Sequence, residues 1–241
     1  MSLIVTVNVE EGIVMASDSR LTMNLPRDVN GQTVLECGVS QSDTIYKTFL
    51  AKNGIGISMY GDATINAIPI SGYIESFINE KMVEGQTSVD EVPELLVEYF
   101  QAMSNIPNTG FHVAGYKTEG EKRVKKVYKV IISNGNISNI VPNQLLHGSI
   151  WDGESDVLIR VINPHLHFSE DMVAYSPLTS HSIPFEMFTL QDAIDFAVYA
   201  IKTTADTMRF QMRTKTVGGP IDVLVIKQHE AFWIQKKSLH I

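Results

Sequence analysis

The chain carries apolar positions interleaved with polar ones almost from its first residue. The stretch Leu3–Val9 reads LIVTVNV, and after a turn at Glu10-Glu11-Gly12 a second β-rich run, IVMAS, continues to Ser17. Two such runs around a short glycine-containing turn predict a β-hairpin. Most domains leave their first few residues loose, so a strand that begins at the third residue calls for an explanation.

Further strands are predicted in pairs along the chain. Asn53-Gly54, a strong hairpin turn, separates two of them, and Asn134-Gly135 precedes another. The segments with strand character read TIYKTFLAK, GIGISMYG, GFHVAGYK, VKKVYKVIIS, ISNIV, PIDVLVIKQ and AFWIQKK. Residues 24–42, which contain Pro26 and Asn30-Gly31, are expected to be irregular apart from a short strand at Val34–Val39.

Four other segments show the helical spacing of apolar residues. They cover residues 62–78, 88–105, 153–162 and 191–211. Asp62 is expected to cap the first helix, and Ser88 and Glu91 have the spacing of a capping box at the start of the second. Residues 163–189 have no clear period and are expected to form an irregular insertion.

The order of these elements is strands, two helices, strands, two helices and strands, without a linker or an internal repeat. Antiparallel hairpins with helices in two pairs predict a layered α+β fold. Each sheet must bury one face, and two antiparallel sheets back to back, with the helices outside, satisfy every element. We therefore expect a single domain over residues 1–241.

The composition is that of a globular protein, with 44% hydrophobic and 19% charged residues. The formal net charge of −8 argues against a nucleic acid or an anionic membrane as partner. One basic cluster, formed by Lys122, Arg123, Lys125 and Lys126, departs from this balance. We interpret it as the solvated end of a strand and not as a phosphate-binding patch, because no aromatic or glycine-rich loop accompanies it.

The sequence carries no strong signal for a metal, a cofactor or a membrane span. His165 and His167 would place two imidazoles on one strand face, but no further ligand at a recognised spacing completes the set. Gly54 and Gly56 lack the rest of a dinucleotide-binding pattern. The single cysteine, Cys37, suits a reducing compartment, and no run approaches the roughly 20 apolar residues of a spanning helix. We expect a cytoplasmic protein without metal or cofactor.

Five stretches, in family order and at near family spacing, resemble the proteasome β-type subunits and their bacterial relatives among the N-terminal-nucleophile (Ntn) hydrolases. They read SLIVTV, GIVMASDSRLTM, DTIYKT, GDATI and VGGPIDVLVI. The resemblance implies a four-layer αββα sandwich of two antiparallel sheets, which agrees with the order of elements, and a homo-oligomeric ring. Residues 163–189 have no counterpart in it.

The resemblance also explains the early first strand. In this family the first residue of the mature chain attacks an amide carbonyl through its hydroxyl, and its own α-amine takes the proton. An α-amine has a pKa of roughly 7.7–8, so one residue supplies both the nucleophile and its base. Counted back from ASDSR, the N-terminal threonine of the family falls on Ser2, which the removal of Met1 would expose.

Supporting residues follow from the same resemblance. Asp18 matches an acidic residue that pairs with a lysine and orients the N-terminal residue. Thr44 stands where the family has that lysine, and Lys47 is expected to lie on the opposite face of its strand. The glycine whose backbone N–H stabilises the oxyanion falls on Ser58 or Met59, and any residue except proline keeps that donor.

The last matched stretch lies beside the active site in the family. Its aspartate and serine, which contact the N-terminal amine, align with Thr214 and Val217, and Gly218 would allow close backbone approach. A serine at the entry to a later helix matches Asp152. The frame of the site is therefore kept, whereas its charged groups are changed.

Two functions fit this pattern. In the first, Asp18, Asp152 and Thr214 form a rebuilt site around Ser2, and the protein hydrolyses peptide bonds or small amides. In the second, the protein is a non-catalytic relative that kept the fold for oligomeric assembly or for binding a partner. The position of Ser2 in register favours the hydrolase.

Overall fold

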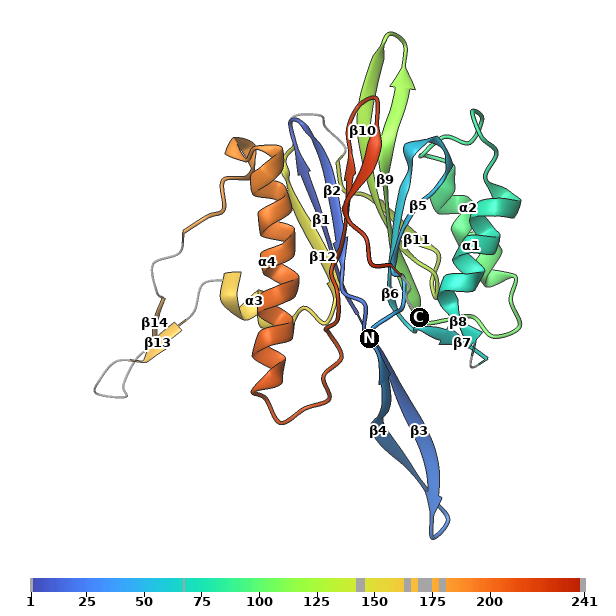
Figure 1. Cartoon of the computed structure of the whole chain (residues 1–241), viewed down its shortest axis with the longest axis vertical. Helices are drawn as coiled ribbons and strands as arrows, with labels where there is room; N and C mark the ends of the chain where they lie inside the picture. Colours follow the sequence, from blue (N-terminus) through green and yellow to red (C-terminus); the bar gives the residue numbers. More distant parts are fainter. Residues whose placement is uncertain are drawn as a thin grey trace.

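Two antiparallel sheets face each other in the computed structural model, and helices cover their outer sides (Figure 1). The structure describes residues 2–66, 68–141, 146–162, 166–168, 175–177 and 181–238. The first sheet has the order β12 (Gly148–Gly153), β1 (Leu3–Val9), β2 (Gly12–Ser17), β15 (Asp222–Ile226) and β16 (Ala231–Gln235). The second has the order β11 (Asn136–Asn139), β10 (Lys122–Ile131), β9 (Thr109–Glu119), β6 (Gly56–Gly61) and β5 (Thr48–Leu50). The α+β class with antiparallel sheets is therefore confirmed.

The helices form two groups, one on each sheet. They are α1 (Ile70–Lys81), α2 (Val92–Gln101), α3 (Asp156–Ile162) and α4 (Leu190–Arg209). Figure 1 shows α3 and α4 beside β1 and β12, and α1 and α2 beside the second sheet. Strand alternation supplies the buried faces, because Leu3, Val5 and Val7 pack with α4 whereas Ile13 and Met15 of β2 point toward the second sheet.

The predicted hairpins are confirmed at both ends of the chain. β1 pairs with β2 from Ile4 opposite Ser17 to Val9 opposite Gly12, and β15 pairs with β16. The turn between β5 and β6 contains Asn53 and Gly54, both at positive φ, as this dipeptide leads one to expect. Every residue of β1 and β2 is buried, so a strand that starts at Leu3 lies in the centre of the protein.

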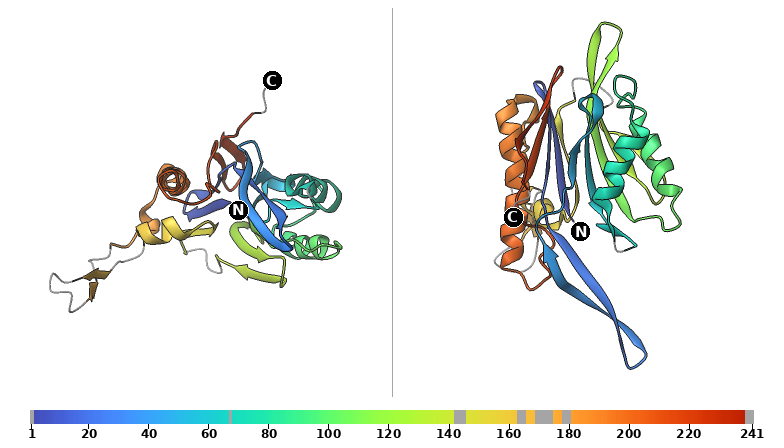
Figure 2. Two further views of the ribbon diagram at one scale, coloured as in Figure 1. Left: turned by 90° about the horizontal axis from the view of Figure 1, so that it is seen from below. Right: turned by 45° about the vertical axis from the view of Figure 1, so that its right-hand side comes forward.

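The expectation for residues 24–42 is wrong. They belong to a long two-stranded ribbon, β3 (Leu21–Val29) and β4 (Gln32–Ser42), which projects away from the two sheets (Figure 2). Asn30 and Gly31 adopt positive φ and form its turn. Pro26 is compatible with a strand here because a two-stranded ribbon has outer edges where no N–H is needed. The turn and proline signals that suggested irregular structure therefore belong to a hairpin.

The first helix starts later than expected. Residues Thr64–Ile65 (β7) and Ile68–Pro69 (β8) pair with each other, and α1 begins only at Ile70. Pro69 has an extended backbone, φ −55° and ψ 131°, and a proline also disfavours helical dihedrals at the residue before it. Asp62 is not a helix cap, because its carboxylate accepts a hydrogen bond from the Asn108 N–H at 2.8 Å.

The other helices lie where the sequence predicts them, but some of them begin or end at other residues than expected. α2 begins after a turn in which the Glu91 carboxylate accepts from the Ser88 N–H at 2.8 Å. α3 begins at Asp156 because the residues before it form β12. α4 starts with a capping box between Thr189 and Asp192. In the described part of the chain, none of the helices combines the length and the apolar character that crossing a bilayer requires.

The proposed insertion at 163–189 is described only in pieces. Two short strands, β13 (Leu166–Phe168) and β14 (Tyr175–Pro177), pair with each other, and a 3-10 turn covers Phe185–Met187. Residues 163–165, 169–174 and 178–180 lie outside the described residues, and His165 is among them; of His167 only the backbone is described.

Candidate active site

Ser2 lies at the start of β1, at the end of the sheets from which the β3–β4 ribbon projects (Figure 1). Its carbonyl oxygen accepts a hydrogen bond from the Glu154 N–H at 2.7 Å. Gly153 packs so closely on this carbonyl that a Cβ at position 153 would lie 1.8 Å from the oxygen. Ser2 has no exposed surface, and its Oγ has no hydrogen-bond partner among the described residues. The backbone of Ser2 is thus fixed while its hydroxyl is unengaged.

Asp18 connects the residue after Ser2 to the loop that precedes β15. One carboxylate oxygen accepts from the Leu3 N–H at 3.0 Å, and the other accepts from the Gly218 N–H at 3.1 Å. The first oxygen also accepts from the Lys47 ammonium at 2.7 Å. Both side chains of this ion pair are completely buried. The peptide bond between Ser2 and Leu3 is therefore held directly by a buried, charged pair.

The expectation that Lys47 faces away from the site is wrong. β5 starts at Thr48, so the alternation of its side chains does not extend back to Lys47. The ammonium also donates to the Arg20 carbonyl at 2.7 Å. Burial lowers the pKa of Lys47, although the neighbouring Asp18 opposes the shift. Lys47 therefore pairs with Asp18, although it lies three residues after Thr44, where the resemblance places a lysine.

Thr44, by contrast, is not part of the site. It is exposed, and its hydroxyl shares a hydrogen bond of 2.8 Å with the Ser42 hydroxyl. The backbone N–H of Met59 is also committed, because it donates to the Lys47 carbonyl at 2.8 Å. Met59 therefore does not offer a free oxyanion donor. The Ser58 hydroxyl is buried and bonds to the Thr48 hydroxyl at 2.8 Å.

Thr214 and Gly218, both in the segment before β15, have different surroundings. Gly218 reaches the site through its bond to Asp18, and a Cβ on it would clash with the Arg20 guanidinium at 2.6 Å. Thr214 instead lies against Gly38 of the ribbon, at 3.0 Å from the position of a Cβ there. The structure thus brings Gly218 to Asp18 and places Thr214 at the base of the β3–β4 ribbon.

Asp152 belongs to a buried polar network between the two sheets. His112 of β9 bonds through Nε2 to one Asp152 oxygen at 2.9 Å and through Nδ1 to the Thr6 hydroxyl at 2.9 Å. The Lys129 ammonium donates to the other Asp152 oxygen at 2.6 Å. Since an ionised carboxylate only accepts, His112 Nε2 carries the proton and Nδ1 accepts from Thr6. Asp152 therefore does not touch the Ser2 hydroxyl but joins β12 to β9 and β10.

Burial and pairing shift the pKa values of His112 and Asp152 in this network. Burial lowers the pKa of His112, although Asp152 acts in the opposite direction. Burial alone would raise the pKa of Asp152, but the hydrogen bonds from His112 and Lys129 bring it below its usual value. Sequence reasoning missed His112 and Lys129. The only signal for His112 was a polar residue in the apolar strand GFHVAGYK, at a position where alternation points between the sheets.

The described residues do not form a metal-binding site. Among the residues that the structure describes, no three His, Cys, Asp or Glu side chains gather in a way that could hold a metal ion. What the arrangement offers is a serine hydroxyl at a strand start, fixed through the backbone on both sides, and a lysine–aspartate pair beside it.

Comparison with known proteins identifies a structure with a similar fold. No family model matches the chain, and the curated proteins give no significant match. Among solved structures, a Gly-1 mutant of Anbu from Hyphomicrobium sp. strain MC1 is similar, with a TM-score of 0.61 and 17% sequence identity over 96% of this chain and 85% of that chain. Anbu is a bacterial proteasome-like protein of the Ntn-hydrolase type. At this identity the likeness shows a shared fold alone.

Proposed function

We propose that the protein is a proteasome-like Ntn hydrolase with the αββα arrangement of that family, and that it cleaves amide bonds with Ser2 as nucleophile. The observation that carries the proposal is the buried Ser2 hydroxyl, which has no hydrogen-bond partner in the described part of the chain and precedes a strand that the Asp18–Lys47 pair holds. Removal of Met1 gives Ser2 the free α-amine that the chemistry requires. The substrate is a peptide or a small amide.

Each step of the proposed reaction uses groups of Ser2 and the substrate. The Ser2 Oγ attacks the carbonyl carbon while the α-amine accepts the hydroxyl proton. The tetrahedral intermediate then collapses, the carbon–nitrogen bond breaks, and the protonated α-amine returns the proton to the leaving amine. An ester on Ser2 remains. Water attacks this ester with the α-amine again as base, and the Ser2 hydroxyl is restored.

Lys47 and Asp18 support this chemistry through charge and position. A fixed ammonium near the N-terminus lowers the pKa of the α-amine, so more of it is in the basic form at neutral pH. The same charge stabilises the negative oxygen that develops during attack, and its effect is strong because the site is dry. Asp18 keeps Lys47 in place and fixes Leu3 through its backbone N–H.

The test is an intact-mass measurement before and after treatment with a hydroxyl-reactive β-lactone. Under the proposal, the native protein lacks Met1 and gains one adduct on Ser2, and Ser2→Ala gains none. Ser19→Ala is the matched control, because Ser19 is also buried but donates its hydroxyl to the Pro220 carbonyl at 2.5 Å. It should still be labelled. A native protein that keeps Met1 would contradict the proposal, since the α-amine would belong to the wrong residue.

The second candidate is a non-catalytic subunit, and the complete burial of Ser2 favours it. In both cases we propose a homo-oligomer, by analogy with the ring assemblies of the resembled family. Native mass spectrometry of the same sample reports the assembly, which should be a multiple of the 26.8 kDa chain. Assembly without an adduct supports the second candidate, and a monomer contradicts the oligomer under both.

A further inference from the structure

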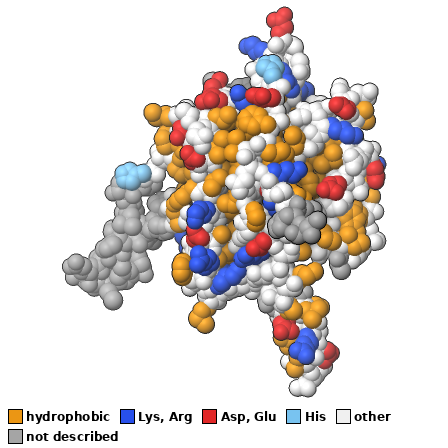
Figure 3. All heavy atoms as spheres, in the orientation of Figure 1, with side chains coloured by type: hydrophobic (Ala, Val, Ile, Leu, Met, Phe, Trp, Pro, Cys, Tyr) orange, Lys and Arg blue, Asp and Glu red, His pale blue; other side chains and the backbone are white. Residues whose placement is uncertain are grey.

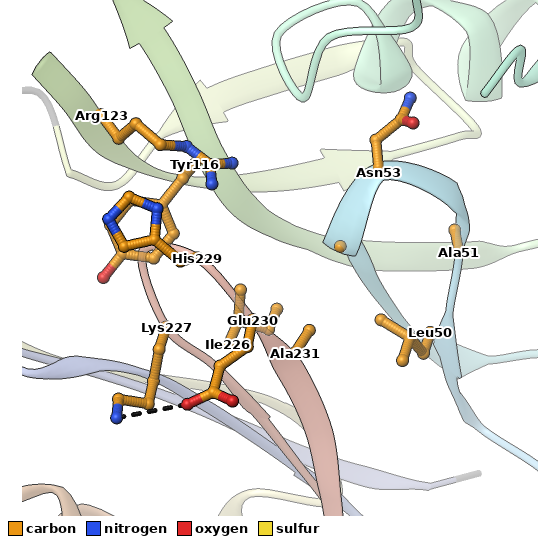
Figure 4. A pocket seen from close by; sticks show the side chains of 11 residues that line it. Leu50, Ala51, Asn53, Tyr116, Arg123, Ile226, Lys227, His229, Glu230 and Ala231 are labelled. Carbon is orange, nitrogen blue, oxygen red and sulfur yellow. Dashed lines mark ion pairs between the residues drawn. The ribbon is translucent and has the colours of Figure 1, made fainter. Parts of the chain in front are cut away.

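A hollow lies at the opposite end of the two sheets from Ser2, between the tips of two hairpins (Figure 4). Its volume is about 310 Å³. The β9–β10 hairpin contributes Tyr116 and Arg123, and the β15–β16 turn contributes His229. A second hollow of about 590 Å³ adjoins it, because Tyr116, Arg123 and His229 line both. The Ser2 chemistry uses none of these residues.

The carboxylates around the two hollows already have partners. Glu230 pairs with Lys227 at 3.4 Å across the β15–β16 turn, as Figure 4 shows. Glu10 pairs with Lys125 at 3.6 Å. Glu11 accepts from a backbone N–H at the start of α4 at 3.2 Å. None of the three carboxylates is therefore paired with the remaining cation of the lining, Arg123.

Among the described residues, Arg123 has no counterion. Its guanidinium carbon lies 5.9 Å from the centre of the Tyr116 ring. In the described chain it forms no ion pair and no hydrogen bond, and its Nε is buried without a partner. A buried donor without a partner costs about 1–3 kcal/mol, and more for a charged group. A guanidinium fork satisfies this need best with a planar carboxylate, which it binds through two parallel hydrogen bonds.

The other residues that line the two hollows indicate the polarity and charge of the rest of the ligand. Leu50, Ala51, Ile226 and Ala231 form an apolar side of the first hollow, facing the aromatic ring of Tyr116. The second hollow is lined by as many carboxylates as cations, so its walls have no excess positive charge to hold a polyanion or a dianionic phosphate. A single cation without a carboxylate partner among the lining residues and an apolar wall together suit a monoanion.

We propose that this hollow binds a small monocarboxylate with an apolar body, with its carboxylate on Arg123 and its body against Leu50 and Ile226. The sequence predicts a solvated strand end at residues 122–126, but Lys125 and Arg123 of this basic cluster have different surroundings. Lys125 is almost completely buried and donates to the Val9 carbonyl at 2.7 Å, whereas Arg123 faces the hollow. A hollow of this volume is large enough for a ligand of the size of phenylacetate.

The test is calorimetric titration of the full chain with phenylacetate at constant ionic strength. Phenylacetamide is the matched neutral ligand, and inorganic phosphate is the competing anion. We expect saturable binding of phenylacetate and at least tenfold weaker binding of the other two. Arg123→Gln should weaken phenylacetate binding at least tenfold. Arg27→Gln, which makes the same charge change on the exposed ribbon, should leave it unchanged.

A second variant keeps the test decisive where Arg123→Gln fails to fold. Ala231→Leu adds bulk to the apolar wall without a change of charge and should also abolish binding. Equal binding of phenylacetate and phenylacetamide would overturn the role of Arg123, and tighter binding of phosphate would overturn the ligand class. Absence of saturable phenylacetate binding to the wild type would overturn the site itself. No measurement here depends on Ser2, so the outcome is independent of the proposed hydrolase.

Discussion

At the residue scale, the Asp18–Lys47 pair is the feature on which the candidate site depends most. Both charges are fully buried, and each is satisfied by hydrogen bonds to backbone as well as to its partner. A buried ion pair adds little net stability compared with apolar residues, but removal of one member leaves a buried, uncompensated charge. The pair is therefore sensitive to single substitutions in a way that surface pairs are not.

We expect Lys47→Met to destabilise the protein by about 3–5 kcal/mol, because Asp18 stays behind as an unpaired buried carboxylate. Labelling of Ser2 by the β-lactone should fall at the same time. Urea unfolding gives the free energy. The matched control is Lys202→Met, which removes an exposed helix pair with Asp206 and should cost less than about 1 kcal/mol. Equal losses in the two variants would show that Asp18 does not depend on Lys47.

The contact between Gly153 and Ser2 gives a second prediction at this scale. In Gly153→Ala the new Cβ would collide with the Ser2 carbonyl oxygen, so β1 must shift at its first residue. Gly120→Ala is the control, because Gly120 also has positive φ but has open space around it. Both variants should be destabilised by roughly 1–2 kcal/mol, because the alanine Cβ introduces left-handed backbone strain. Only Gly153→Ala should lose Ser2 labelling as well, and retained labelling would mean that the contact does not position Ser2.

At the scale of elements, the β3–β4 ribbon stands apart from the rest of the chain. Its large apolar side chains Leu25, Val29, Val34 and Leu35 are about half exposed. Figure 3 shows hydrophobic side chains among charged ones on the projecting ribbon. Its base, by contrast, is attached to the protein. Leu21 is buried, and the Thr22 hydroxyl donates to the Lys215 carbonyl at 3.4 Å. The ribbon thus has a fixed base and an independent tip.

Shortening the ribbon tests this division. Replacement of residues 27–34 by Asn-Gly joins Pro26 to Leu35, which are paired across the ribbon, through a two-residue turn. We expect the free energy of unfolding to change by no more than about 0.5 kcal/mol, because only exposed side chains are lost. Thermal unfolding measures the change. A deeper truncation that includes Leu21 and Thr22 should destabilise clearly. A large loss from the tip alone would show that it packs on something else.

At the scale of the whole molecule, the two sheets are joined by polar contacts as well as by apolar ones. His112 reaches from β9 to Thr6 of β1 and to Asp152 of β12, both of which belong to the other sheet. Thr6 is paired with Met15, which packs in one apolar layer with Ile13 and Leu224. Protonation of His112 therefore acts on the contact between the sheets and not on one element alone.

This contact makes stability depend on pH. The pKa of His112 is lowered in the folded protein, so below the unfolded value of about 6.5 the unfolded chain binds a proton that the folded chain does not. Stability is then present above pH 6.5 and falls as the pH drops, by at most about 1.4 kcal/mol per pH unit. Asp152, whose pKa is also lowered, adds a further loss only as the pH falls below about 4.

Urea unfolding between pH 7.5 and pH 5 measures the effect. The wild type should lose stability across this range, and His112→Gln should lose less with pH because the titrating group is gone. His181→Gln, at an exposed position, should behave as the wild type does. An unchanged pH dependence in His112→Gln would assign the acid sensitivity to another group.

The sequence by itself determined the α+β class, the paired strands and the long helix α4, because period-2 and period-3.6 patterns reflect which face of an element is buried. It also singled out Ser2, Asp18 and Gly218, which the structure links through Leu3 and the Asp18 carboxylate. Helix α1 was placed too early because pairing of residues 64–69 depends on contacts that a local pattern does not contain.

Tertiary structure alone decided which polar groups meet. The partner of Asp18 is Lys47, 29 residues away, and the partners of Asp152 are His112 and Lys129 on the other sheet. Such pairs form because a buried charge must find a counterion wherever the fold brings one near, and this condition leaves no period in the sequence. The resemblance placed a lysine at Thr44, whereas the ammonium that reaches Asp18 belongs to Lys47, three residues further along the chain.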